Sequence, residues 1–574
     1  MDTRELFKKL TGYDAYDYQI RAWEKIHEIM EDGGKVIIEV QTAGGKTETA
    51  IMPFLREMYN ETWSVSRLIY VLPTRSLVEK QAERIRKLVE KLYSLKGYPN
   101  AEKISEKSVL VEYGLEKTHA FLGNVILTTW DSFLYGIAAH RTVGNRFTFP
   151  AGSIAQSLVV FDEVQMYQDF SLYMPRILAL VIKMLKKAKV PVVVMSATIP
   201  SKLIDIIAEG AVKVEVHDSD KLKPLRGEVK VEISESFDKL FGVVVDTLKT
   251  GKRVLVVRNT VDRARNTYEK LKSLKEIQNK KIILIHSRFT VEDRKRKELR
   301  LEEADLIVAT QVVESGLDFE KVALVITDIA PLDALIQRIG RCARRSNEKG
   351  KAIILIESAE REPREVKKKS RSPEFVRGFR EILEKLGIEE EKVSGIRFEN
   401  CSLVFNRVGE KKEIKVTSSY PCHPYDPLVL MRTFDELENP KKIEEFLLDV
   451  KITREALDRV YRYHYEKNIV PKEYYSAYLY FRELKLFSLP PEYELRARPE
   501  LYSMLYIGGE CFDAEKIIRV EYNWLRNKEK IIESELKVDE EGRVKVEEFR
   551  GVKPLVIYKL KGGFYDPEIG VVEP

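Results

Sequence analysis

Two short stretches decide the fold: KVIIEVQTAGGKT at residues 35–47 and SLVVFDEVQ at residues 157–165. Each opens with a run of apolar, mostly β-branched residues, which predicts a strand that is buried on both faces. The first run leads into a Gly-Gly-Lys-Thr turn and the second into an Asp-Glu pair. Because open parallel sheets bind ligands at the carboxyl ends of their strands, the two stretches predict one sheet with a binding edge.

Similar runs continue along the chain in two blocks. The first block adds strands at 67–72, 124–129 and 191–197, with amphipathic helices between them, for example at 76–95. After a break near 218–227 the pattern restarts, with strands at 253–258, 281–287, 304–310, 322–328 and 351–357. Strands that alternate with helices predict doubly wound α/β sheets. We therefore expect two α/β lobes at 1–218 and 219–360, a charged linker at 361–376, and a mixed, aromatic-rich C-terminal accessory domain at 377–574.

The composition narrows the class of protein. With 574 residues the chain is too long for one hydrophobic core. The net charge is only +6, so a nucleic-acid surface would have to be a local groove. The four cysteines include no CxxC pair, which predicts neither disulfides nor a zinc site. The N-terminus has no apolar signal segment and lysines interrupt the most apolar stretch, 178–195, so we expect a cytoplasmic protein with no membrane contact.

The turn at 40–47 predicts a phosphate-binding loop, because it follows a strand and precedes a helix. Backbone N–H groups in such a loop point at phosphate oxygens, and the helix N-terminus adds partial positive charge. Lys46 is expected to bind the β- and γ-phosphates of ATP, and the Thr47 hydroxyl to bind Mg²⁺. The alternative is a surface turn that happens to carry a lysine. The loop residues expected to contact the nucleotide are Thr42, Ala43, Gly44, Gly45, Lys46 and Thr47.

The acidic pair at 162–163 completes this predicted site. Asp162 is expected to hold the Mg²⁺ ion, and Glu163 to polarise the attacking water. Considered without the other motifs, this pair could also be a solvent-exposed acidic turn that follows a strand. The phosphate-loop pattern earlier in the chain makes the catalytic interpretation the stronger one. Ser196-Ala197-Thr198 closes the next strand and is expected to couple the nucleotide site to strand movement.

The second block contributes QRIGRCARR at residues 337–345, which we expect to lie on a helix. Arg338, Arg341 and Arg344 recur every three residues and would share one helical face. An arginine that reaches a transferring phosphoryl group stabilises its charge, so Arg341 and Arg344 are candidate catalytic arginines. Gln337 could contact the γ-phosphate or its water. The alternative is a basic surface helix.

These motifs, in this order, resemble the helicases of superfamily 2, whose two lobes are RecA-like. Gln19, preceded by Tyr18 and followed by Arg21, looks like the adenine-reading element of that superfamily, with Phe7 or Tyr13 as a ring that stacks on adenine. PTRSLV at 73–78, TTWDSF at 128–133 and ATQVVESGLD at 309–318 look like its further motifs. The last of these implies nucleotide contacts from Gly316 and Asp318.

Several spellings resemble one family more closely, the CRISPR-associated helicase of type I interference systems. They are DEVQMYQD at 162–169, VVRNTVDRA at 256–264, LIHSRFTVEDR at 284–294 and again ATQVVESGLD at 309–318. The resemblance covers about residues 5–360. Gln165 replaces the usual His of the acidic motif, and Ala43 stands where the loop usually has Gly, which puts the efficiency of turnover in doubt.

The resemblance implies an ATP-dependent, 3′-to-5′ translocase on single-stranded DNA. It would be recruited by an RNA-guided type I effector complex, and its two lobes would hold the strand through its phosphates without reading bases. Each candidate contact could instead be a loop cap or a surface group. The candidates are Thr74, Arg75, Thr129, Arg258, Asn259, His286, Ser287, Arg288 and Thr310.

Many members of that family carry an N-terminal HD nuclease domain, for which this sequence leaves no room before Gln19. Its seven histidines form no cluster, so we expect the nuclease to be a separate HD-family subunit. Tyrosines crowd residues 455–506, where they either pack a helical core or stack on bases. Two other functions stay open: a cellular superfamily 2 RNA or DNA-repair helicase, and a nucleotide-gated DNA clamp with little turnover.

Overall fold

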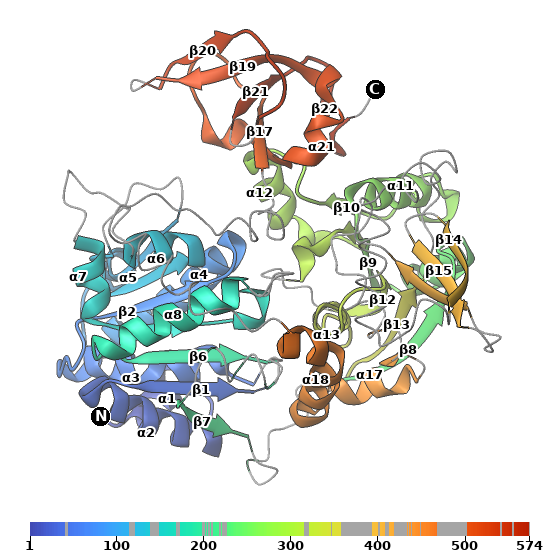
Figure 1. Ribbon diagram of the computed structural model, residues 1–574. Helices are drawn as coiled ribbons and strands as arrows, with labels where there is room; N and C mark the ends of the chain where they lie inside the picture. The colour runs from blue at the N-terminus through green and yellow to red at the C-terminus, as the bar shows by residue number, and fades with distance from the viewer. Residues whose placement is uncertain are drawn as a thin grey trace. The chain divides into compact units, whose positions relative to one another are not determined.

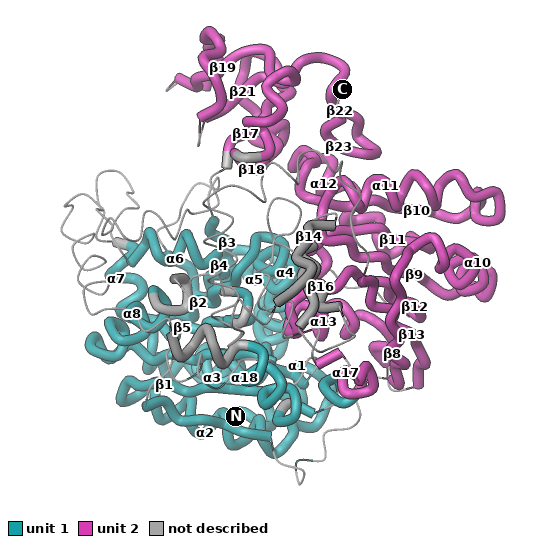
Figure 2. Tube along the Cα trace, turned by 45° about the vertical axis from the view of Figure 1, so that its right-hand side comes forward, with its two compact units in different colours: residues 1–225, 445–489 teal, residues 226–444, 490–574 magenta. Residues whose placement is uncertain are grey.

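The computed structural model describes most of both predicted lobes and part of the C-terminal region. The described residues are 1–40, 44–113, 121–137, 149–167, 173–197, 201, 204, 207, 210–216, 220, 227–314, 321–345, 347–356, 393–399, 402–407, 413–417, 433, 436–437, 439–447, 449–467, 502–539, 542–553 and 556–572. The chain forms two compact units, coloured separately in Figure 2: residues 1–225 with 445–489, and residues 226–444 with 490–574. The domain boundaries expected at 218, 360 and 376 stay predictions, and the linker 361–376 lies outside the described residues.

The first unit is built on a seven-stranded parallel sheet. Its strands run in the spatial order β3-β4-β2-β5-β6-β1-β7, and every neighbouring pair is parallel. All the carboxyl ends therefore lie at one edge, where the predicted binding motifs begin. The strands are β1 (Lys35–Glu39), β2 (Arg67–Leu72), β3 (Val109–Glu112), β4 (Val125–Thr129), β5 (Ser157–Phe161), β6 (Val192–Ser196) and β7 (Val212–Glu215).

Helices cover both faces of this sheet, as Figure 1 shows. On one face Leu68, Tyr70 and Val160 share a buried core with the first four helices. On the other face Phe161 packs edge-on against Trp130 and Phe133, with ring centroids 5.9 and 5.3 Å apart. Successive strand residues thus serve opposite layers. The helices are α1 (Thr3–Thr11), α2 (Asp17–Asp32), α3 (Lys46–Asn60), α4 (Arg75–Leu95), α5 (Ala101–Ser108), α6 (Trp130–Ile137), α7 (Phe149–Ala155) and α8 (Tyr173–Lys187).

The second unit contains a six-stranded parallel sheet in the order β10-β11-β9-β12-β13-β8. Its strands are β8 (Glu228–Ser234), β9 (Arg253–Val257), β10 (Ile282–Ile285), β11 (Leu306–Ala309), β12 (Val322–Asp328) and β13 (Lys349–Leu355). The helices between them are α10 (Phe241–Lys249), α11 (Val261–Lys272), α12 (Val291–Leu299) and α13 (Leu332–Ile339). The two parallel sheets confirm the prediction of two RecA-like lobes.

The described part of the C-terminal region contains both sheets and helices. It holds an antiparallel three-stranded sheet of β14 (Val393–Glu399), β15 (Ser402–Arg407) and β16 (Glu413–Thr417). A five-stranded sheet follows, from β17 (Tyr502–Tyr506), β18 (Ile517–Glu521), β19 (Ile532–Val538), β20 (Val544–Glu547) and β21 (Ile557–Leu560), and then a hairpin of β22 (Tyr565–Asp566) and β23 (Gly570–Val571). Its helices are α17 (Lys441–Phe446), α18 (Val450–Lys467) and α21 (Tyr522–Arg526). The tyrosines between 468 and 501 lie outside the described residues.

Three strands of the two parallel sheets escape the sequence analysis: β3, β7 and β8. All three lie at sheet edges. An edge strand is covered less completely than a central one, so its sequence alternates polar and apolar residues, as in VKVE of β7 and EVKVEIS of β8. The central strands and the edge strand β10 supply continuous apolar runs, whereas β3 (VLVE) is short and ends in a charged residue.

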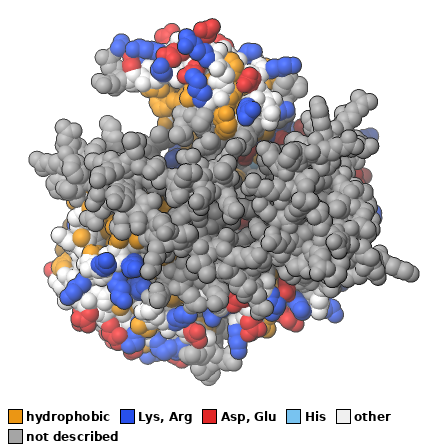
Figure 3. Space-filling view, viewed as in Figure 1, with side chains coloured by type: hydrophobic (Ala, Val, Ile, Leu, Met, Phe, Trp, Pro, Cys, Tyr) orange, Lys and Arg blue, Asp and Glu red, His pale blue; other side chains and the backbone are white. Residues whose placement is uncertain are grey.

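Charges of both signs mingle on the visible surface of the described residues (Figure 3). This fits the small net charge of the chain, +6. Within the described part of the chain, no helix combines the length and the apolar character that crossing a membrane requires.

Candidate functional site

The phosphate-loop motif leaves the carboxyl end of β1 and opens helix α3. Gly45 is the N-cap of α3 with φ +85°, a left-handed conformation that favours glycine. A Cβ atom at this position would come within 2.9 Å of Nε2 of Gln19. Lys46 and Thr47 follow as the first two residues of the helix, and both are buried. The loop therefore has the strand-turn-helix setting that phosphate binding requires.

The acidic pair lies close to this lysine. Asp162 directly follows β5, and Glu163 takes φ +51°, a backbone conformation that is rare for any residue other than glycine. Nζ of Lys46 lies 3.5 Å from Oε1 of Glu163. The structure thus brings Lys46, Asp162 and Glu163 together at one sheet edge, although 117 residues separate the lysine from the glutamate.

Asp162 is a buried carboxylate with two hydrogen-bond donors. Tyr70 on β2 donates its hydroxyl to Oδ2 at 2.6 Å, and the Glu163 backbone N–H donates to Oδ1 at 2.8 Å. Burial raises the pKa of Asp162, and the negative charge of Glu163 raises it further, whereas Lys46 and Tyr70 oppose the rise. A divalent cation here would stabilise the ionised carboxylate in the same way as Lys46 does.

The side chains around Asp162 offer oxygen ligands of the kind that Mg²⁺ prefers. The Thr47 hydroxyl accepts a hydrogen bond from Gln81 Nε2 at 3.3 Å, which orients it from helix α4. Among the described residues no group of three or more His, Cys, Asp or Glu side chains is placed to hold a metal ion. Thr47 and Asp162 would therefore hold Mg²⁺ together with the phosphates of a nucleotide, which is how this ion usually binds in phosphoryl-transfer sites.

Gln19 is buried against the phosphate loop. Its Nε2 donates to Thr49 Oγ1 at 3.1 Å and to the Gly45 carbonyl at 3.4 Å, while its Oε1 accepts from the Tyr16 N–H at 3.0 Å. Tyr18 donates its hydroxyl to the Gly44 carbonyl. In this structure both residues brace the loop, and the adenine-reading role of Gln19 stays a prediction.

One of the two rings proposed to stack on adenine is excluded. Phe7 is 5% exposed and packs against Trp23 in the core, with ring centroids 5.4 Å apart, so the expectation for this residue is wrong. It occupies an apolar position on the inner face of α1 beside Leu6 and Leu10. Tyr13 is 74% exposed and stays a candidate.

The residues of the first unit that are candidates for contact with DNA lie at the ends of β-strands or just after them. Thr74 is the N-cap of α4, where its hydroxyl accepts from the Leu77 N–H at 3.4 Å. Arg75 is exposed, and its guanidinium lies 5.2 Å from the centroid of the Tyr113 ring. Thr129 is buried, and its hydroxyl contacts Ser132 Oγ at 3.2 Å. Two of the three therefore have local capping roles as well.

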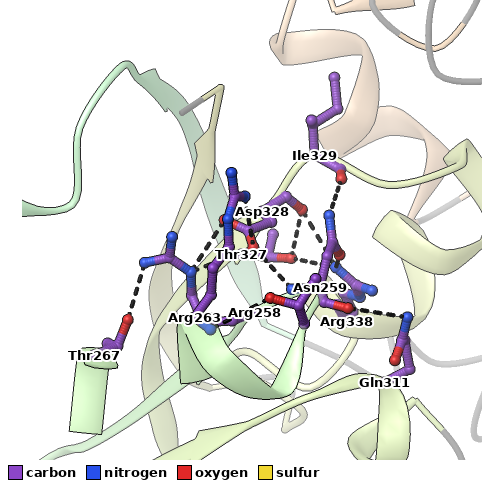
Figure 4. A network of polar contacts seen from close by, with 10 residues as sticks. Arg258, Asn259, Arg263, Thr267, Gln311, Thr327, Asp328, Ile329 and Arg338 are labelled. Carbon is purple, nitrogen blue, oxygen red and sulfur yellow. Dashed lines mark hydrogen bonds and ion pairs between the residues drawn. The ribbon is translucent and has the colours of Figure 1, made fainter. Parts of the chain in front are cut away.

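In the second unit, Arg258 and Asn259 are held in a buried polar network, shown in Figure 4. Asp328, at the end of β12, pairs with Arg258 Nε at 3.1 Å and accepts from the Asn259 N–H at 2.8 Å. Arg338 is fully buried and donates to Asn259 Oδ1 at 2.9 Å and to Thr327 Oγ1 at 3.0 Å. The side chains of Arg258 and Asn259 thus join β9, β12 and α13 of the lobe, and their role in strand binding stays a prediction.

The motif at 337–345 is not one continuous helix, which corrects the sequence expectation. Helix α13 ends at Ile339, and the N–H groups of Arg341 and Cys342 bond to carbonyls three residues earlier. Ala343 takes φ +46°, and its N–H donates to Val322 on β12. The chain turns here because it must enter β13. Arg341 and Arg344 therefore lie beyond the helix rather than on its face.

The described candidates at this turn differ in exposure. Gln337, on α13, is half-buried, as is Arg344. Arg341 is 8% exposed, and its Nη2 donates to the Glu314 carbonyl at 2.8 Å. Their catalytic roles stay predictions. The remaining nucleotide candidates, Thr42, Ala43, Gly316 and Asp318, lie outside the described residues, as does Thr198.

The histidine motif at 284–294 holds the C-terminal hairpin. His286 is fully buried; its Nδ1 accepts from the Arg288 N–H at 3.1 Å, so its Nε2 donates to the Ile569 carbonyl at 3.2 Å. Burial lowers the pKa of His286 well below its ordinary value, and the charge of Arg288 lowers it further. Gly570 packs so closely that a Cβ atom would come within 2.5 Å of the Arg288 carbonyl oxygen.

Arg288 is likewise engaged within the second unit. Its guanidinium lies 4.0 Å from the centroid of the Trp524 ring and pairs with Asp262 at 3.0 Å. Ser287 is exposed, whereas Thr310 is buried. Among the described residues of this unit that are candidates for contact with DNA, only Ser287 is exposed to solvent. All of these assignments stay predictions.

Tyr70 and Gln81, which support the site, were not among the predicted residues, and Tyr18 was named only as a neighbour of Gln19. Tyr70 had a visible signal, because it is the one hydroxyl inside the apolar run RLIYVL. A hydroxyl buried in a strand needs a hydrogen-bond partner, and an acidic residue at the end of a neighbouring strand is a suitable one. Gln81 offered no such signal on its amphipathic helix.

Comparison with known proteins shows which families the chain resembles. Residues 16–206 match the family model of the DEAD/DEAH box helicases, and residues 250–347 match that of the C-terminal part of the CRISPR-associated nuclease/helicase Cas3. The chain is 27% identical over 512 residues to the CRISPR-associated helicase Cas3 of Thermoproteus tenax, covering 86% of this chain and 75% of that protein. It is also 27% identical over 406 residues to the CRISPR-associated endonuclease/helicase Cas3 of Escherichia coli, covering 56% of this chain and 44% of that protein.

Solved structures have the same fold. The crystal structure of T. fusca Cas3 with AMPPNP superposes with a TM-score of 0.58 at 15% identity, over 99% of this chain and 71% of that one. The T. fusca Cas3-ADP structure matches with the same TM-score at 16% identity, again over 99% and 71% of the two chains. The chain therefore contains a region of the DEAD/DEAH box helicase type and is similar in sequence to Cas3 helicases, which supports an ATP-hydrolysing helicase of superfamily 2.

Proposed function

We propose that the chain couples hydrolysis of Mg²⁺-bound ATP to 3′-to-5′ movement along single-stranded DNA during CRISPR type I interference. The observation that carries the proposal is the meeting of Lys46, Asp162 and Glu163 at one sheet edge, with 3.5 Å between Nζ of Lys46 and Oε1 of Glu163. A cation for phosphate charge, a carboxylate for metal and a carboxylate for water are the parts that phosphoryl transfer to water requires.

Each residue has a separate task in this chemistry. Lys46 neutralises charge on the β- and γ-phosphates, while the loop N–H groups hold their oxygens. Thr47 and Asp162 would hold Mg²⁺, which offsets the charge that develops during transfer. Glu163 orients and polarises the attacking water. Arg341, Arg344 and Gln337 of the second lobe complete the site in the proposed closed state, and opening after hydrolysis moves the strand.

The exposed and half-buried candidates are the ones we favour for direct contact with the strand. Arg75 and Ser287 are exposed and Thr74 is half-buried, so they can reach phosphates without disturbing a core. Arg258, Asn259, His286 and Arg288 would act mainly by shaping the loops around them, because their side chains already have internal partners. Contacts to phosphates suit a motor that must ignore base sequence.

Glu163→Gln should abolish steady-state hydrolysis while leaving ATP binding intact. The amide keeps the shape of the side chain but cannot polarise water, so we expect kcat to fall by about 100-fold or more. Lys46→Ala should instead weaken nucleotide binding, since it removes a phosphate contact. Phosphate release and binding of a fluorescent ATP analogue measure the two effects. A Glu163→Gln protein with full activity would refute the catalytic assignment.

Tyr70→Phe should weaken the binding of Mg²⁺ without unfolding the lobe. The change removes only the hydroxyl that donates to Asp162, and a hydrogen bond to a charged group contributes ~1.5–3 kcal/mol. We expect about tenfold more Mg²⁺ to be needed for half-maximal ATP hydrolysis. Tyr93→Phe is the matched control, because the Tyr93 hydroxyl contacts Ser108, which is not part of the site. Identical Mg²⁺ titrations for the two variants would contradict the role of Tyr70.

Single-stranded DNA should stimulate ATP hydrolysis more strongly than single-stranded RNA or duplex DNA. The stimulation should fall with salt, since phosphate contacts release counterions. Phosphate release with each nucleic acid over a salt series measures this. Preference for RNA would favour a cellular RNA helicase instead. Tight DNA binding with no stimulated turnover would favour the nucleotide-gated clamp.

We further propose that the chain works with an RNA-guided type I effector complex and a separate HD-family nuclease subunit. Several relatives carry both activities in their names, nuclease and helicase, whereas the site assembled here serves ATP hydrolysis alone. We expect affinity purification of the chain from a native extract to recover an HD-type nuclease. Recovery of the effector complex without such a nuclease would count against the separate subunit.

A further inference from the structure

Helix α18 belongs to the first unit, although it follows the second sheet in the sequence. Residues 445–489 form one compact unit with residues 1–225, and Figure 2 shows α18 in the colour of that unit. The helix start is well defined, because Asp449 Oδ1 accepts from the N–H groups of Lys451 and Ile452. Ala456, Leu457 and Val460 are buried, so α18 is packed against its neighbours rather than loosely attached.

One residue of α18 pairs with the strand that leads into the phosphate loop. Arg454 donates through Nε to Glu39 Oε1 at 3.0 Å and through its Nη2 to the second carboxylate oxygen. Glu39 is the last residue of β1 and is only 6% exposed. The two-point contact fixes the orientation of both groups, since the guanidinium and the carboxylate are planar.

A second residue of α18 contacts the segment that follows the neighbouring strand. Asp458 Oδ1 accepts from the backbone N–H of Ser201 at 2.7 Å. Ser201 comes shortly after Ser196, the last residue of β6, and Ser196 is the direct strand partner of Glu39. Arg454 and Asp458 lie four residues apart and therefore on one helical face. This face thus contacts the last residue of β1 and Ser201, which follows the neighbouring strand β6 in the sequence.

The charge at Glu39 depends on this helix. Burial raises the pKa of Glu39 to about 7, and the nearby Glu215 on β7 raises it too, whereas Arg454 and Lys213 lower it. A buried carboxylate that loses its arginine would either take up a proton or stay charged without its partner, and both outcomes disturb the strand end. Only Val40 and the phosphate loop separate Glu39 from the lysine that binds phosphate.

We propose that α18 is a positioning helix for ATP binding, and that Arg454 acts as a positioning residue by holding Glu39 and, through β1, the phosphate loop. The inference rests on the proposed function and adds a regulatory contact to it. A signal that moves α18 would change nucleotide affinity, because the same helix face holds the end of β1 and Ser201 after β6. Asp458 serves the exit of β6, where Ser196 and Ala197 lie.

The test compares full-length Arg454→Ala, Arg454→Lys and Glu39→Gln with the wild type. We expect Arg454→Ala to raise KM for ATP and the Kd of a fluorescent ADP analogue about five- to tenfold, with kcat changed less than twofold. Arg454→Lys keeps the charge but not the two-point contact, so it should restore part of the affinity. Lys451→Ala is the matched control, because it removes one exposed positive charge from the same helix.

The pH dependence gives a readout that a purely structural contact would not move. As the pH falls through about 7, Glu39 takes up a proton and the two-point contact with Arg454 is lost. Because the pKa of Glu39 is raised, its contribution to folding stability decreases as the pH rises toward 7. Over the same pH range the affinity for ATP should increase, so folding stability and ATP affinity change in opposite directions. We expect the wild-type KM for ATP to rise below pH 7 by more than that of Glu39→Gln, measured under the same conditions.

The outcomes separate this inference from the proposed function. If wild-type protein binds the ADP analogue but does not hydrolyse ATP, the proposed function fails, while the binding comparison still tests α18. Wild-type affinity in soluble, folded Arg454→Ala would overturn the inference. Should Arg454→Ala fail to fold, Arg454→Lys and Glu39→Gln decide, and superimposable KM-against-pH curves for Glu39→Gln and wild type would overturn it equally.

Discussion

The structure depends on a cluster of opposite charges at the carboxyl edge of the first sheet. Asp162 and Glu163 are adjacent carboxylates, one of them buried, and their mutual repulsion would be costly without a cation. Lys46 supplies that cation from the loop after β1, and Tyr70 adds a hydrogen bond from β2. A parallel sheet makes this possible, because strands that are distant in the sequence end at the same edge. Bound nucleotide and Mg²⁺ would enter a site whose charges are already arranged.

Two other buried acids in the described residues are held by an arginine in a similar way. Asp328 at the end of β12 is held by Arg258 and by the Asn259 backbone, and Arg338 links this network to Glu314. Glu39 at the end of β1 is held by Arg454 of α18. In each case the partner comes from a different element, so the buried charge also ties elements together. Breaking one partner would leave an uncompensated charge, which costs more than the pair contributes.

Buried polar groups need partners within the protein. Several motif residues therefore stabilise the fold of their lobe, either in addition to contacting a ligand or instead of doing so. Arg258 and Asn259 match helicase spellings, yet their side chains are buried and bonded within the second unit. Gln19 is bonded to the phosphate loop, and His286 to the C-terminal hairpin. Phe7 is simply core. A sequence motif identifies which residue occupies a position. The burial of that residue in the folded protein decides which groups its side chain can contact.

The sequence by itself determined the two parallel sheets, their central strands, and the polar residues that follow β1 and β5 at the carboxyl edge of the first sheet. Continuous apolar runs that end in GGKT or DE have few other structural interpretations, and these expectations agree with β1, β5 and the helicase family. Local patterns also indicated helix α4 nearly to its ends. The edge strands β7 and β8 were missed because they alternate polar and apolar residues, and β3 because its apolar run is short.

Only the tertiary structure decided which polar side chains meet. It ended α13 at Ile339, paired Tyr70 with Asp162, and placed Arg454 against Glu39 across 415 residues of sequence. The physical reason is that strand and helix formation follow from local periodicity, which any window of sequence contains. The partner of a buried charge depends instead on chain packing over long distances, and no local pattern records it.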